Sequence, residues 1–165
     1  MLSKAERVIL ANQYEIMKAL DSEASDYYES KIAILRGGYS RYYGEILDTV
    51  DDDFPEEISD EVVNILRMFR SLLFSYQDLS DEEKSDVLQR KISFKGFDGN
   101  EEGDHYNFCK YLLNDADSFH ELQTSKGYNS HRNTLPGYRR MLRKWEELKK
   151  KDNLSFNDIN HIVEN

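Results

Sequence analysis

The sequence has little cysteine, proline or glycine: one cysteine, two prolines and eight glycines among 165 residues. Because Cys109 stands alone, the chain cannot form an internal disulfide, and a zinc site built on several cysteines would lack its ligands. Long apolar runs are also missing, since Leu72–Phe74 is typical of the longest pieces and a membrane-spanning helix needs about 20 apolar residues. Glu6 and Arg7 interrupt the segment where a secretory signal would need its apolar region. We therefore expect a cytoplasmic protein with no membrane-spanning segment.

Apolar residues recur mostly at helical spacing, and the two prolines, Pro55 and Pro136, leave long uninterrupted stretches between them. The pattern predicts an all-α fold, a compact bundle-like array of about eight or nine helices. At most one short extended segment is expected, near residues 91–95. Neither a repeat nor a linker is visible, so we expect a single helical domain over residues 1–165.

Capping signals and glycines give approximate helix limits. Ser3 with Glu6, Ser80 with Glu83 and Ser155 with Asp158 have the spacing of capping boxes. The adjacent glycines 37 and 38 can take the left-handed conformation that ends a helix. The expected helices include 3–20, 23–36, 40–50, 80–89 and a short one over 116–122, and the stripe from Ile58 to Tyr76 marks a central core helix. Further helices are expected to carry the apolar residues between 106 and 113, to form the basic helix at 138–151, and to end the chain from Ser155 onward.

The net charge of −10 is unevenly distributed. Residues 126–151 hold nine basic side chains against two glutamates, a balance of +7, which leaves −17 for the rest of the chain. Like charges at i and i+4, such as Arg139 and Arg143, repel one another on an isolated helix. The basic helix therefore needs acids nearby, and the candidates are residues 51–53 with 56–57, or residues 81–83, within one subunit or across an interface.

Metal-binding patterns are weak. Asp98 to Gly103 resembles the opening of an EF-hand loop, but Cys109 stands at the twelfth position, where a bidentate glutamate is needed. Asp98 is better explained as a turn former and helix N-cap. His105 and Cys109 are four residues apart, yet no spacing supplies two further zinc ligands. We therefore predict no metal and no cofactor.

Several separate stretches, taken in order along nearly the whole chain, resemble the YfbU family of bacterial proteins. The resemblance implies a small, predominantly helical cytoplasmic protein of about this length, and it supplies no catalytic residues to transfer. It rests on 11–14 (ANQY), 20–21 (LD), 38–39 (GY), 68–70 (MFR), 94–101 (FKGFDGNE), 129–131 (NSH) and 138–145 (YRRMLRKW).

Polar residues of the matching stretches that lie in expected loops, or begin the basic helix, are the candidates for ligand or partner binding. These are Asp98, Asn100, Glu101, Asn129, Ser130, His131, Arg139 and Arg140. We expect the two loops and the start of the basic helix to share one surface.

The leading functional hypothesis is a protein-interaction or regulatory module that acts as a homo-oligomer, with a dimer favoured and the basic helix meeting an acidic surface. One alternative is a metal-dependent, hydrolase-like enzyme that uses Asp98, Glu101 and His131. Another is nucleic-acid binding through the basic helix at 138–151, which the negative overall field disfavours. Whether the protein is an enzyme stays open, with the balance against it, and no catalytic residue is assigned.

Overall fold

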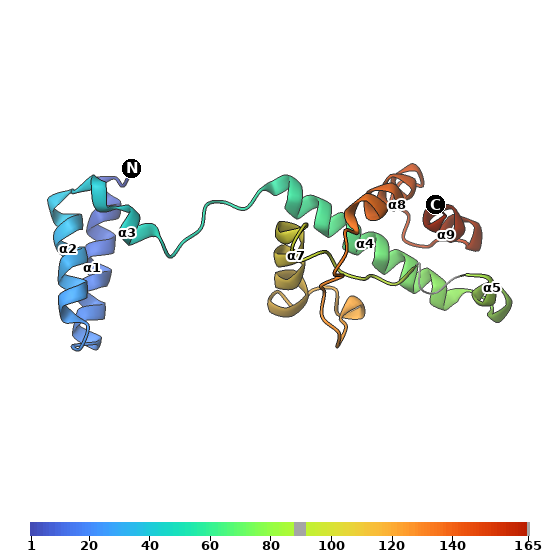
Figure 1. Cartoon of the computed structure of the whole chain (residues 1–165), viewed down its shortest axis with the longest axis horizontal. Coiled ribbons are helices and arrows are strands. Elements are labelled where there is room, and N and C mark those ends of the chain that lie inside the picture. Colours follow the sequence, from blue (N-terminus) through green and yellow to red (C-terminus); the bar gives the residue numbers. More distant parts are fainter. Residues whose placement is uncertain (88–91, 165) are drawn as a thin grey trace. The chain divides into compact units, whose positions relative to one another are not determined.

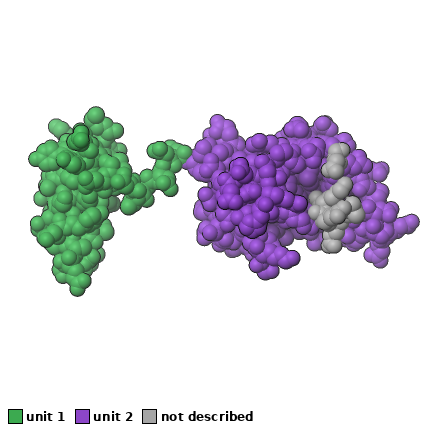
Figure 2. All heavy atoms as spheres, in the orientation of Figure 1, with its two compact units in different colours: residues 1–53 green, residues 54–165 purple. Residues whose placement is uncertain are grey.

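The computed structural model describes residues 1–87 and 92–164. Helices account for the regular structure of these two ranges, which contain no β-sheet, so the expected all-α fold is confirmed. The chain divides into two compact units, Met1–Asp53 and Phe54–Asn165, which Figure 2 shows in different colours. The expectation of a single domain stays a prediction. None of the helices in the described ranges has the length and hydropathy that crossing a membrane requires.

The first unit is a helical hairpin. Helices α1 (Lys4–Leu20) and α2 (Ser25–Gly37) lie side by side in Figure 1 and run in opposite directions. The predicted capping box begins α1, because the Ser3 hydroxyl accepts from the Glu6 amide while the Glu6 carboxylate accepts from the Ser3 amide. Gly38, at φ 69°, ends α2 in the left-handed conformation, as the sequence predicted.

A helix over residues 40–50 was expected to follow the hairpin, and this prediction is wrong. The segment instead forms the short 3₁₀ turn η1 (Ser40–Tyr42) and a single α-helical turn, α3 (Gly44–Leu47). Gly44, at the junction, is a poor helix former because it loses much backbone entropy on folding. The apolar core of this unit is small: Ala11, Ile34, Leu35, Tyr43 and Ile46.

The second unit is built around α4 (Glu56–Asp78), which packs against α7 (Gly103–Lys110), α8 (Leu135–Glu147) and α9 (Phe156–Val163). The predicted apolar stripe is confirmed, since Val62, Ile65, Leu66, Phe69 and Leu72 are at most 1% exposed. They form the centre of a core to which the neighbouring helices and loops contribute. Burial of such side chains is the main favourable term in folding, at about 1.5–3 kcal/mol for each.

Two serines also lie on the buried side of α4. The Ser75 hydroxyl donates to the carbonyl of Asp152 at 3.0 Å and accepts from the amide of Leu154 at 2.8 Å. The Ser71 hydroxyl lies 3.1 Å from the carbonyl of Arg67 and 3.4 Å from a carboxylate oxygen of Asp152. These hydroxyls fasten the loop between α8 and α9 to the central helix.

α5 (Asp81–Asp86) follows α4 along the chain. The predicted capping boxes are present at the starts of α5 and α9. The expected continuation of α5 to Gln89 falls partly on residues 88–91, which lie outside the described ranges. The elements are α5 (Asp81–Asp86), α7 (Gly103–Lys110), the π-helical turn η2 (Tyr111–Asp115), the 3₁₀ turn η3 (His120–Leu122), α8 (Leu135–Glu147) and α9 (Phe156–Val163).

Two local predictions need correction. The helix expected over 116–122 is reduced to η3, because Asp117 and Phe119 take positive φ and interrupt it. The basic helix starts earlier than expected, since Pro136 occupies its first turn, where a proline is tolerated. At most one short extended segment was expected near 91–95, and residues 92–95, which form no strand, agree with that limit; Lys91 lies outside the described residues. Phe97 forms one isolated bridge with Asn129.

Candidate functional site

The two polar loops that contain Asp98 and His131 lie next to each other in the second unit. The Phe97 amide donates to the carbonyl of Tyr128, and the Ser130 amide donates to the carbonyl of Phe97, both at 2.9 Å. Gly96 allows this approach: it has φ +80°, and a Cβ built on it would lie 1.8 Å from the carbonyl oxygen of Tyr128. The structure therefore brings together residues 96–102 and 128–134, far apart in the sequence.

Two of the predicted binding side chains are used to build these loops. A carboxylate oxygen of Asp98 accepts from the amides of Asn100 and Glu101, at 2.9 and 3.4 Å. Asp98 is thus a turn former, as expected, but it does not cap α7, which begins four residues beyond Gly99. The amide oxygen of Asn129 accepts from the amides of Gly99 and His131, at 3.2 and 2.9 Å.

Of the other candidates in the loops, one forms a hydrogen bond within its loop and three are exposed to solvent. The Ser130 hydroxyl donates to the carbonyl of Arg132 at 2.6 Å. Asn100, Glu101 and His131 are exposed, and His131 has a positive φ of 51°. The loops thus present these three side chains to solvent, and their role in binding stays a prediction.

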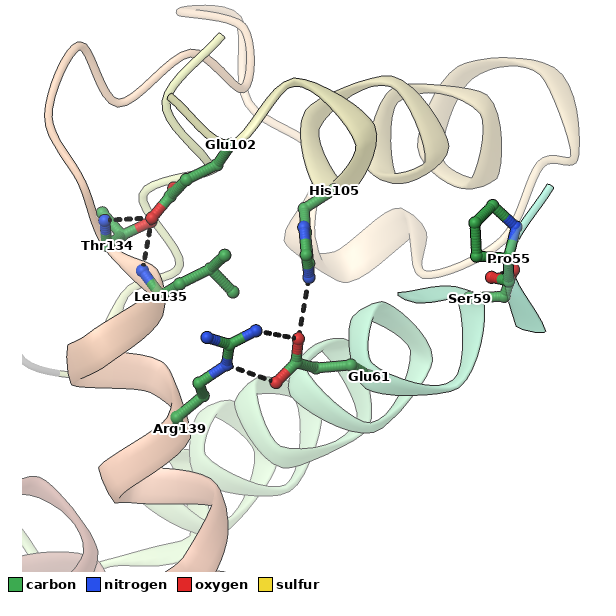
Figure 3. Close-up of polar contacts among 8 residues, drawn as sticks. All are labelled: Pro55, Ser59, Glu61, Glu102, His105, Thr134, Leu135 and Arg139. Atoms are coloured by element: carbon green, nitrogen blue, oxygen red, sulfur yellow. Dashed lines mark hydrogen bonds and ion pairs between the residues drawn. The ribbon is translucent and has the colours of Figure 1, made fainter. Parts of the chain in front are cut away.

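Glu102, which the sequence analysis did not select, joins the two loops to the start of α8. Its side chain is buried, with 4% of the residue exposed. One carboxylate oxygen accepts from the amides of Thr134 and Leu135 at 2.7 and 2.6 Å, and the other accepts from the amide of Asp98 at 2.8 Å. Figure 3 shows this carboxylate at the first turn of α8. Since the Thr134 side chain does not cap the helix, Glu102 performs that task from a distant segment.

Arg139, another predicted binding residue, is held by an acid. Its guanidinium donates to both carboxylate oxygens of Glu61 at 2.7 and 2.8 Å, and His105 Nε2 lies 2.7 Å from the same carboxylate. Figure 3 shows these three side chains converging from α8, α4 and α7. The guanidinium of Arg139 lowers the pKa of Glu61. The basic helix thus pairs with an acid of α4 that was not among the candidates.

The other basic residues near α8 divide into two groups. Lys144 donates to the carbonyls of His161 and Glu164, and Lys151 donates to Asp158. Arg140 and Arg143 are exposed and form no ion pair with any residue that the structure describes. Only part of the predicted positive charge is therefore neutralised within the unit.

The possible metal ligands are used in other ways. His105 contacts Glu61 and packs its ring 5.6 Å from that of Phe97. Cys109 is completely buried in the core, and burial raises the pKa of its thiol to about 12. Within residues 1–87 and 92–164, no group of three or more histidine, cysteine, aspartate and glutamate side chains is placed to hold a metal ion.

In the first unit, one side of α1 is both apolar and exposed. Arg7, Ala11, Tyr14 and Lys18 face α2, which leaves the opposite side of the helix uncovered within this unit. Ile9, Ile16 and Leu20 on that side are 58–83% exposed, and Val8, 59% exposed, lies at its edge, where it lines a cavity with Leu35 of α2. We call this surface the uncharged face; it comprises Ala5, Val8, Ile9, Asn12, Ile16, Ala19 and Leu20 and contains no ionisable side chain.

The described structure defines the class: an all-α protein with a short helical hairpin, a larger helical unit and a binding candidate in two joined loops. The YfbU domain family matches residues 1–165. The chain is 34% identical over 168 residues to the UPF0304 protein MJECS11 of Methanocaldococcus jannaschii, an alignment that covers 99% of both proteins. The chain belongs to the YfbU family, as the sequence motifs indicated.

Proposed function

We propose that this protein is a protein-interaction or regulatory module that acts as a homodimer, and that two copies meet through the uncharged face of α1. The observation that carries the proposal is the exposure of large apolar side chains along this face, with Leu20 at 83% and Ile16 at 61%. Contiguous exposed apolar surface of this kind marks interaction sites in proteins.

The charge pattern supports a second copy as the occupant. In a twofold contact the same surface lies on both partners, so every charge on it would meet its own kind or need a compensating charge. The uncharged face avoids this conflict in a protein whose net charge is −10. Residues 5, 9, 12, 16 and 19 of this face follow one another at alternating spacings of four and three, which is the seam pattern of packed helix pairs. All of them are apolar except Asn12.

The size of the first unit supports the same conclusion. It has 53 residues and seven buried apolar residues, five of which form one core cluster, and units this small usually need oligomerisation or another staple for stability. The basic-helix contact considered from the sequence has less support, since Arg139 is paired with Glu61. That pairing likewise weakens the case for nucleic-acid binding through this helix.

The hydrolase alternative has little support from the loop geometry. Asp98 is buried, with 6% of the residue exposed, and its carboxylate accepts hydrogen bonds from two amides of its own turn. His131 belongs to the second loop and is exposed. The described residues supply no third ligand to join them at a metal site.

The test is the solution mass of the wild type and of charge variants, measured by light scattering at physiological salt. We expect twice the chain mass of 19.5 kDa for the wild type. The Ile9→Lys/Ile16→Lys variant should be monomeric, because each isoleucine contributes about 1.5–3 kcal/mol and occurs twice in a twofold contact. Val50→Lys, which changes an exposed apolar residue outside the face, should remain dimeric.

A rescue experiment distinguishes contact between copies from contact with the second unit. The Ile9→Glu/Ile16→Glu variant alone should also be monomeric, but an equimolar mixture with the lysine variant should form a heterodimer. A wild type that stays monomeric at tens of micromolar would refute the proposal. Dimers that persist in both charged variants would show that the contact lies elsewhere.

A further inference from the structure

Two adjoining cavities lie in the second unit, beside the joined loops. Their volumes are about 630 and 340 Å³, in the range of small-molecule sites. Lys95 and Arg132 line both cavities; Lys126 lines the larger one and Arg140 the smaller. Four basic side chains from three separate segments thus border one continuous site, which we call the basic groove.

These four side chains are exposed and form no ion pair with any residue in the described ranges. Two carboxylates line the cavities, but Glu121 is already paired with Arg70. The second carboxylate that lines the cavities belongs to Glu164. The groove therefore carries an excess of positive charge on a protein that is acidic overall. Such a local excess of positive charge attracts an anion, and the positive charge of the groove stays uncompensated when no anion is bound.

The backbone that carries two of these cations is fixed. The Lys95 amide donates to the Tyr138 hydroxyl at 3.0 Å, and the next carbonyl, that of Gly96, accepts from the Thr134 hydroxyl at 2.9 Å. The carbonyl of Arg132 accepts from the Ser130 hydroxyl at 2.6 Å. The entropic cost of ordering these segments on ligand binding is therefore small, because the fold has already ordered them.

We propose that the basic groove binds a small organic phosphate. Lys95, Arg132 and Arg140 supply the separate positive charges that a doubly charged phosphate needs, and guanidinium groups match its oxygens in pairs. The larger cavity continues past Leu73, Ile92 and Phe94, which offer an apolar wall for the organic part. Ser130 and Asn129, candidates from the sequence, also line this cavity.

The acidity of the whole protein favours a small ligand over a polymer. A nucleic-acid strand would extend its negative charge over the surrounding surface, and the net charge of −10 opposes that. A single phosphate ester places its charge only beside the four cations.

The test is a titration of the ¹⁵N-labelled full chain with phenyl phosphate at low salt, followed by amide chemical shifts. We expect saturable shifts at Lys95, Gly127 and Arg132. Phenol, which lacks the phosphate, should cause none, and inorganic phosphate should bind more weakly than phenyl phosphate. The Lys95→Gln/Arg132→Gln variant should bind at least about tenfold more weakly, because hydrogen bonds to a charged partner are lost. Both residues are exposed, so the variant should keep its fold.

Arg143→Gln provides the matched control, since Arg143 is exposed on the same helix as Arg140 and lines neither cavity. Its affinity for phenyl phosphate should equal that of the wild type. An equal loss in this control, or the absence of saturable shifts in the wild type, would overturn the proposal. So would a single-stranded oligonucleotide that binds more tightly as its length increases, because the groove would then serve a polymer.

Discussion

The buried carboxylate of Glu102 leads to the sharpest stability prediction. Glu102→Ala removes the acceptor of three backbone amides, those of Asp98, Thr134 and Leu135, at 2.6–2.8 Å. A hydrogen bond to a charged group contributes about 1.5–3 kcal/mol, but water can enter the shortened site and the losses do not add. We therefore expect the free energy of unfolding of the second unit to fall by about 3–4 kcal/mol.

The assay is urea unfolding followed by tryptophan fluorescence. Trp145 is the only tryptophan, and it is 2% exposed in the second unit, so its emission reports on that unit. Glu101→Ala is the matched control, because Glu101 is the adjacent carboxylate and is exposed; it should change stability by at most about 0.5 kcal/mol. Glu102→Gln should fall between the two, since its amide keeps one acceptor oxygen but turns an NH₂ group toward an amide donor.

The result that would refute this reasoning is a Glu102→Ala variant within about 0.5 kcal/mol of the Glu101→Ala control. In that case, water would replace the carboxylate without loss, and the start of α8 would not depend on this side chain. A loss in the Glu102→Gln variant as large as that in Glu102→Ala would show that one remaining acceptor oxygen does not stabilise this site and that both carboxylate oxygens are required.

Two further predictions concern the same unit. Gly96→Ala should lower the free energy of unfolding by more than about 2 kcal/mol in urea titrations, because Gly96 has a positive φ and the added Cβ would overlap the carbonyl of Tyr128. Gly103→Ala is the control: a Cβ at that position meets no atom within 4 Å, so this variant should not destabilise the unit. Arg139 lowers the pKa of Glu61, so the contribution of Glu61 is complete above its unfolded pKa and is lost as the pH falls through its folded pKa. Glu61→Gln should therefore cost about 1 kcal/mol at pH 7, a modest value because Arg139 is half-exposed, and the difference from wild type in thermal unfolding should shrink steadily as the pH is lowered below 4.5. A difference that is constant with pH would contradict the ion-pair explanation.

Local signals in the sequence predict the helices well. The capping boxes at Ser3, Ser80 and Ser155 act through residues three positions away, and the stripe of α4 repeats within one element. Predictions fail where long-range packing decides the backbone. The segment near Phe119 is an example: this residue takes a positive φ without being a glycine, and its ring is buried against the guanidinium of Arg70, 51 positions before the acid that pairs with that arginine.

The candidate site is less predictable for the same reason. The sequence suggested that the loops around Asp98 and His131 share a surface, and the structure does bring the loops together through Phe97 and Asn129. Glu102 and Glu61 were missed because their partners lie 32–33 and 78 positions away. The Thr134–Pro136 sequence does mark a helix start, but nothing in it identifies a distant carboxylate as the cap.

The two buried serines of α4 limit how the core can change. At apolar positions such as Leu66, another hydrophobic residue of similar volume would preserve most of the packing. At Ser75, an alanine or valine would fill the space but leave the amide of Leu154 and the carbonyl of Asp152 without their partner. The tolerance of α4 to substitution is therefore uneven: its apolar positions accept other hydrophobic residues of similar volume, while Ser71 and Ser75 are constrained by their hydrogen bonds to the loop between α8 and α9.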